Sequence, residues 1–162
     1  MNGKSFALLF AFLIAIGTAL SLALSNERPE SIGTSFEDFQ AHRDLWVSRR
    51  PKGYAVKVDR QCYCPIWSAR VTVAGAEVKD VEFLVDRSDP SIFADASRFP
   101  RDIDTVFEIF NTAYKEKAYN IELTFDETYG YPVRAFIDWN HDTVDDETYF
   151  ELSEFKPADG SS

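Results

Sequence analysis

The residues most able to do chemistry in this sequence are two cysteines that stand two positions apart, Cys62 and Cys64, followed directly by Pro65. In an extended strand, residues two apart have Cα atoms about 6.6 Å apart, so a disulfide between them requires a kink in the chain. A closed loop of about three residues constrains the unfolded chain by only about 1.6 kcal/mol. Stabilisation of the fold therefore accounts poorly for the pair.

Four roles for Cys62 and Cys64 are compatible with the sequence. A local disulfide could fix a bulge or a strand end before Pro65. The pair could be redox-active or link a partner, since a strained disulfide is easily reduced. Thiolates could bind a soft metal such as Cu(I), because two sulfurs alone do not complete a tetrahedral zinc site. The fourth role is that of two free, inert thiols, and neither His42 nor His141 is near them in sequence.

A second group of candidate residues lies between positions 138 and 147. Asp138, Asn140 and Asp142 alternate as the oxygen ligands of a calcium-binding loop do. The match then fails, because the loop lacks the glycine of the sixth position and the glutamate of the twelfth. Two interpretations remain, namely an acidic hairpin loop with side-chain turns, and a weak calcium site formed with Glu147.

Charge and missing motifs exclude several classes of function. Lys4 is the only charged residue before Glu27, so the rest of the chain carries 16 basic and 27 acidic side chains, a net charge of −11. Such a surface repels nucleic acids and anionic lipids and favours a basic protein partner. The chain has no nucleophile elbow, phosphate loop, zinc-protease motif or dinucleotide fingerprint. We therefore expect no cofactor and no catalytic residue, although enzymatic activity is not excluded.

Residues 1–25 have the pattern of a secretory signal peptide. One positive charge at Lys4 precedes an apolar run, and small residues precede a cleavage site after Ala23 or Ser25. We expect cleavage and an exported protein, either periplasmic or extracellular. The alternative is an uncleaved membrane anchor, because residues 6–24 are close to the roughly 20 residues that span a bilayer.

The remaining chain is expected to form one small α+β domain over residues 35–156, between a flexible lead-in at 26–34 and a flexible tail at 157–162. Helical spacing predicts two helices, capped by Thr34 and Asp102. Alternating apolar residues predict three strands after each helix, in the order αβββαβββ. Short connections favour an antiparallel sheet of about six strands with both helices on one face.

The third expected strand contains a break in this alternation. Val78 has one parity, whereas Val81, Phe83 and Val85 have the other. An extra residue near Lys79 and Asp80 would keep all four apolar side chains on the buried face. The sequence therefore predicts a β-bulge at this point.

Several short motifs follow one another along the chain: Trp46, Tyr54, Cys62 to Pro65, Phe107, Phe125 to Pro132, and Val144 to Glu147. In this order they resemble a bacterial family of secreted and lipoprotein-anchored proteins catalogued only as a domain of unknown function. The resemblance covers about residues 36–153 and implies export, one small α+β domain and no known activity. The chain departs from the family pattern in a longer segment at 86–101 and in lacking a lipobox cysteine.

The sequence thus favours an exported, non-enzymatic binding or inhibitor-like module that presents turns and aromatic side chains to an unidentified partner. One such turn or surface motif is Tyr129, Gly130, Tyr131 and Pro132. The alternative function is a thiol-dependent protein that handles redox equivalents or a soft metal through Cys62 and Cys64.

Overall fold

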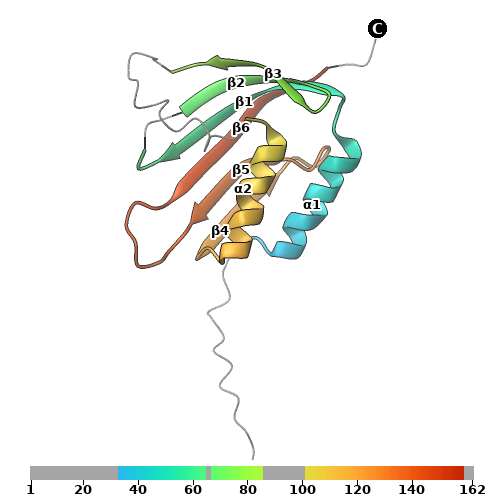
Figure 1. Cartoon of the computed structure of the whole chain (residues 1–162). Coiled ribbons are helices and arrows are strands. Elements are labelled where there is room, and N and C mark those ends of the chain that lie inside the picture. The colour runs from blue at the N-terminus through green and yellow to red at the C-terminus, as the bar shows by residue number, and fades with distance from the viewer. Residues whose placement is uncertain (1–32, 65–66, 86–100, 159–162) are drawn as a thin grey trace, which may run out of the picture.

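The computed structural model describes residues 33–64, 67–85 and 101–158, which form two helices and one six-stranded sheet (Figure 1). The expected signal segment and the lead-in up to residue 32 lie outside the described residues, as do residues 86–100. Within the described ranges, no helix is long and apolar enough to cross a membrane.

The element order αβββαβββ and the single α+β domain are confirmed. The last strand runs to Pro157, one residue past the expected end of the domain. The elements are α1 (Phe36–Arg49), β1 (Gly53–Cys62), β2 (Trp67–Ala74), β3 (Glu77–Phe83), α2 (Ile103–Glu116), β4 (Asn120–Phe125), β5 (Pro132–Asp138) and β6 (Thr148–Pro157).

The sheet is antiparallel throughout, with the strand order β3-β2-β1-β6-β5-β4. The first and the last strand are therefore neighbours at its centre. The predicted bulge in β3 is confirmed, because Thr72 pairs with Asp80 while the next residue, Val73, pairs with Val78. Lys79 is the extra residue, and Val78, Val81 and Phe83 pack against the core, whereas Val85 lies beyond the end of β3 and outside this cluster.

The cap of α1 differs from the expectation. Ser35, and not Thr34, is the N-cap, and its side chain accepts a hydrogen bond from the N–H of Asp38 at 3.1 Å. Thr34 instead lies along the edge of β4, where its N–H donates to the carbonyl of Ile121 at 2.7 Å. Its Oγ1 accepts from the N–H of Leu123 at 2.8 Å. Thr34 thus satisfies backbone groups that an edge strand leaves exposed.

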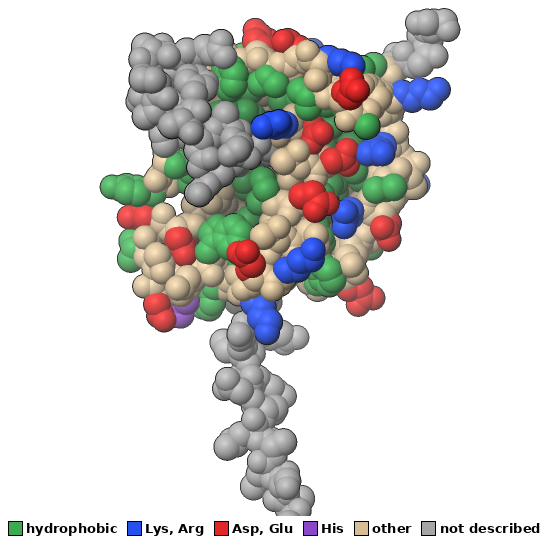
Figure 2. Space-filling model, viewed as in Figure 1, with side chains coloured by type: hydrophobic (Ala, Val, Ile, Leu, Met, Phe, Trp, Pro, Cys, Tyr) green, Lys and Arg blue, Asp and Glu red, His purple; other side chains and the backbone are tan. Residues whose placement is uncertain are grey.

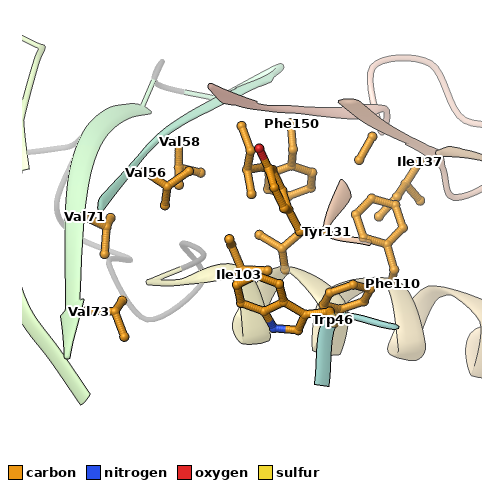
Figure 3. Close-up of a cluster of buried hydrophobic side chains, with 14 of the residues drawn as sticks. Trp46, Val56, Val58, Val71, Val73, Ile103, Phe110, Tyr131, Ile137 and Phe150 are labelled. Atoms are coloured by element: carbon orange, nitrogen blue, oxygen red, sulfur yellow. The ribbon is translucent and has the colours of Figure 1, made fainter. Parts of the chain in front are cut away.

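Both helices cover the same face of the sheet, and the core lies between them and the strands (Figures 1 and 3). Valines of β1 and β2 belong to one cluster of buried side chains with Ile103 and Phe110 of α2 and Trp46 of α1 (Figure 3). Asp104 links the two helices, because its carboxylate accepts from Trp46 Nε1 and from Arg50 Nη1, each at 2.9 Å. As expected, Asp102 caps α2 by accepting from the N–H of Thr105.

Candidate functional site

The two groups of residues singled out from the sequence lie at the same end of the sheet. Cys62 is the last residue of β1 and pairs with Thr148, the first residue of β6. Thr148 also pairs with Ile137, so β5 ends beside it and the β5–β6 loop projects from this end (Figure 1). We call residues 62–64 together with residues 138–147 the disulfide end.

A disulfide joins Cys62 to Cys64, and their Cα atoms are 5.0 Å apart. This distance is shorter than an extended strand allows, because β1 ends at Cys62 and the chain bends at Tyr63 and Cys64. Both cysteines are half-buried, and the chain has no free cysteine. Tyr63, held between them, has an exposed fraction of 84%.

The loop from Asp138 to Glu147 contains five carboxylates and no lysine or arginine. Figure 2 shows acidic side chains over this loop with no basic side chain among them. Burial raises the pKa of Asp138, and the negative charges of Asp146 and Glu147 raise it further. The disulfide therefore borders a region of negative potential.

The expected calcium ligands do not converge. Asn140 uses its side-chain oxygen for a turn, accepting from the N–H of Asp142 at 3.1 Å. Among the described residues, no three or more histidine, cysteine or acidic side chains come close enough to hold a metal ion. This geometry fits the interpretation of the segment as a hairpin loop with side-chain turns. Glu147 directly precedes Thr148, the partner of Cys62, whereas Asp138 lies at the end of β5, one strand further from β1.

The two most exposed large apolar side chains among the described residues both belong to the disulfide end. They are Tyr63 and Val144, with exposed fractions of 84% and 83%. Tyr149, which pairs with Gln61 next to the disulfide, is 54% exposed. A rim of carboxylates around exposed apolar groups is typical of a protein-binding surface.

The histidines pack against aromatic rings. His42 of α1 stacks on Phe125 with ring centroids 3.9 Å apart. His141 of the β5–β6 loop stacks on Tyr119 at 4.6 Å. Each ring therefore has a structural role that needs no ligand.

The motif Tyr129 to Pro132 lies against α1, away from the disulfide end. Gly130, Tyr131 and Pro132 are buried, and only Tyr129 is partly exposed. The ring of Tyr131 meets that of Trp46 at 6.0 Å between centroids. The motif, which belongs to the β4–β5 turn, therefore packs this turn against α1.

Gly130 allows this contact. Its φ is +82°, and a Cβ there would lie 2.6 Å from the carbonyl oxygen of His42. We expect Gly130→Ala to lower the free energy of unfolding by about 2 kcal/mol or more, through left-handed strain and displacement of α1. The matched control is Gly75→Ala, since Gly75 has φ +67° but nothing within 4 Å of an added Cβ. Urea unfolding should show a clearly smaller loss for Gly75→Ala, and equal losses would contradict the packing argument.

A groove that the sequence patterns do not predict lies on the face of the sheet opposite the helices. It has a volume of about 500 Å³ and lies over β4, β5 and the start of β6. Its aromatic wall is formed by Phe136 and Tyr149, whose ring centroids are 4.9 Å apart. The sequence does contain one indication of this groove. Phe136 and Tyr149 occupy the outward-facing positions of their strands, where polar residues are usual.

Comparison with known proteins identifies the family of the chain. No curated protein and no solved structure matches the chain. The family model described as a family of unknown function, DUF6174, matches residues 38–157, which include both helices almost entirely, all six strands and the disulfide end. The chain therefore belongs to this family of unknown function.

Proposed function

We propose that the protein is an exported, non-enzymatic binding module, inhibitor-like in its mode of action, whose recognition surface is the disulfide end. The observation that carries the proposal is the position of Tyr63, which is 84% exposed and held between two disulfide-bonded cysteines. An exposed aromatic residue on a constrained loop is a typical anchor of a binding surface.

The disulfide has a clear role in this proposal. It adds little to stability, because the loop that it closes is so short. It does limit the backbone conformations of Tyr63, so that less conformational entropy is lost when a partner binds. The anchor is therefore ordered before binding.

The proposed partner is a basic protein segment. The pairing of Cys62 with Thr148 brings the β5–β6 loop and its carboxylates to the same end of the sheet as the disulfide. They would attract lysine and arginine side chains around the pocket or cleft that receives Tyr63. Because these carboxylates are on the surface, we expect the association to weaken as ionic strength rises.

Export is supported by the signal-like pattern of residues 1–25 and by the disulfide. Disulfides persist in oxidising compartments, such as the bacterial periplasm, and are rare in the cytosol. The proposed partner is therefore sought outside the cytoplasm.

The test uses a random peptide display library selected on the wild-type protein. We expect the selected peptides to be enriched in lysine and arginine. Tyr63→Ala should weaken their binding about 30-fold or more without changing the melting temperature, because Tyr63 makes no contribution to the core. The control is Val47→Ala on α1, which removes another exposed apolar side chain, 57% exposed, away from the disulfide end. Peptides that bind Tyr63→Ala as tightly as wild type would contradict the proposal.

A further inference from the structure

We propose that the Cys62–Cys64 disulfide exchanges with external thiols in the folded protein and that it selects them by charge, reacting faster with cationic than with anionic thiols. The inference concerns the two sulfurs and not the tyrosine between them. It does not depend on the proposed binding function.

The disulfide is placed where it can open without unfolding the sheet. Among the described residues, the pairing of β1 with β2 ends at Arg60 and Trp67, and the partner of Cys62 is Thr148 of β6. Cys64 lies beyond the strand, and both cysteines are half-buried and not enclosed in the core. Because the closed loop contains only about three residues, opening it releases little chain entropy. The stability of the fold therefore depends little on the disulfide, and the disulfide can be reduced while the sheet remains folded.

The charges beside the disulfide favour cationic reactants. Thr148 lies opposite Cys62, so Asp146 and Glu147, the two residues that precede β6, lie at the same end of the sheet as the disulfide. Burial raises the pKa of Asp138, and the charges of Asp146 and Glu147 raise it further, so these three carboxylates lie within reach of one another. Arg60 shares a face of β1 with Cys62, but it already has an interaction partner within the protein. Within the disulfide end, as defined by residues 62–64 and 138–147, the approaching thiolate therefore meets five carboxylates and no lysine or arginine.

The reaction is a two-step thiol–disulfide exchange. The thiolate of the external thiol attacks one sulfur, a mixed disulfide forms, and the other cysteine leaves as a thiolate that takes up a proton. A second external thiol then attacks the mixed disulfide and releases the oxidised reductant and the second cysteine. Two thiols become one disulfide, and two electrons and two protons pass to Cys62 and Cys64. The proposed natural reductant is a thiol that is flanked by positive charge, such as a cysteine in a basic protein segment.

The experiment compares two small thiols of opposite charge, cysteamine and 2-mercaptoethanesulfonate. Reduction of the folded wild-type protein is followed by alkylation and intact mass, and each rate is divided by the concentration of thiolate. We expect cysteamine to react about five to ten times faster at low ionic strength, and the ratio to approach one at high salt. Equal rates at low salt would overturn the charge selectivity. Reduction that occurs only when the protein unfolds, as seen by circular dichroism, would overturn the exchange itself.

Two matched variants locate the source of the selectivity. Asp145→Asn with Glu147→Gln removes two exposed charges from the β5–β6 loop at the disulfide end, and should lower the ratio to about two or less at low salt. Asp44→Asn with Glu127→Gln removes two exposed charges elsewhere and should leave the ratio unchanged. If both double variants change the ratio equally, the local arrangement is not responsible.

The failure of this inference can be told apart from the failure of the proposed binding function. Tyr63→Ala retains both sulfurs and all neighbouring carboxylates, so its ratio of rates should equal that of the wild type. If Tyr63→Ala loses peptide binding but keeps the wild-type ratio of exchange rates, both proposals are supported. A changed ratio in Tyr63→Ala would overturn the assignment of selectivity to the carboxylates.

Discussion

Replacing Trp46 with alanine is expected to lower the free energy of unfolding by about 3–5 kcal/mol. The side chain is fully buried, and it contacts the rings of Tyr54 and Tyr131 at centroid distances of 5.5 and 6.0 Å. Its Nε1 donates to Asp104, so alanine would leave both a cavity and one fewer link between α1 and α2. Urea unfolding followed by circular dichroism measures the loss.

Two further variants separate these contributions. Trp46→Phe keeps most of the apolar contact but removes the hydrogen bond to Asp104, and should cost about 1–2 kcal/mol. Val47→Ala changes the next residue, which is 57% exposed, and should change stability by less than about 0.5 kcal/mol. A loss for Trp46→Ala no greater than for Val47→Ala would show that α1 is not held on the sheet by this side chain.

Stability is expected to fall steeply with pH above about 10, the ordinary pKa of tyrosine. Burial raises the pKa of Tyr131 to about 12 and also raises the pKa values of Tyr54 and Tyr114. The folded state therefore holds these protons more tightly than the unfolded state does. Their contribution is fully present below about pH 10 and is lost as the pH rises toward the folded pKa values. With three phenols, the slope should reach about 4 kcal/mol per pH unit.

Phenylalanine variants test this assignment. Tyr131→Phe removes one of the three titrating groups and should reduce the slope between about pH 10 and 12 by roughly a third. Tyr63→Phe changes a tyrosine that is 84% exposed and should leave the slope as it is in wild type. An unchanged slope in Tyr131→Phe would mean that other groups govern alkaline unfolding. Urea midpoints measured at several pH values provide the data.

Features set by neighbouring residues could be predicted from the sequence. The bulge at Lys79 follows from a local change of parity between Val78 and Val81. The cap of α2 by Asp102 follows from the residue type and the helical spacing after it. In both cases the burial of apolar side chains on one face leaves a single arrangement of the local backbone.

Features that depend on distant partners could not be predicted. Thr34 is a good N-cap by type, but its backbone and side chain are used by Ile121 and Leu123 of β4, so Ser35 caps α1 instead. The alternation of β1 gives no indication that β6 will be its neighbour. The proximity of Cys62 to the acidic loop depends on that pairing, which is why the sequence presents them as two separate sites.

The central pairing of β1 with β6 has a consequence for the order of events during synthesis. Tyr54 pairs with Pro157, so the middle of the sheet contains contacts between residues about a hundred positions apart. A ribosome-bound chain cannot complete this pair until the end of β6 has emerged, and such long-range contacts also form slowly. The six-stranded sheet therefore cannot be completed before β6 has been synthesised. A chain whose sheet is still incomplete can be threaded through a translocation channel, which suits a protein proposed to be exported.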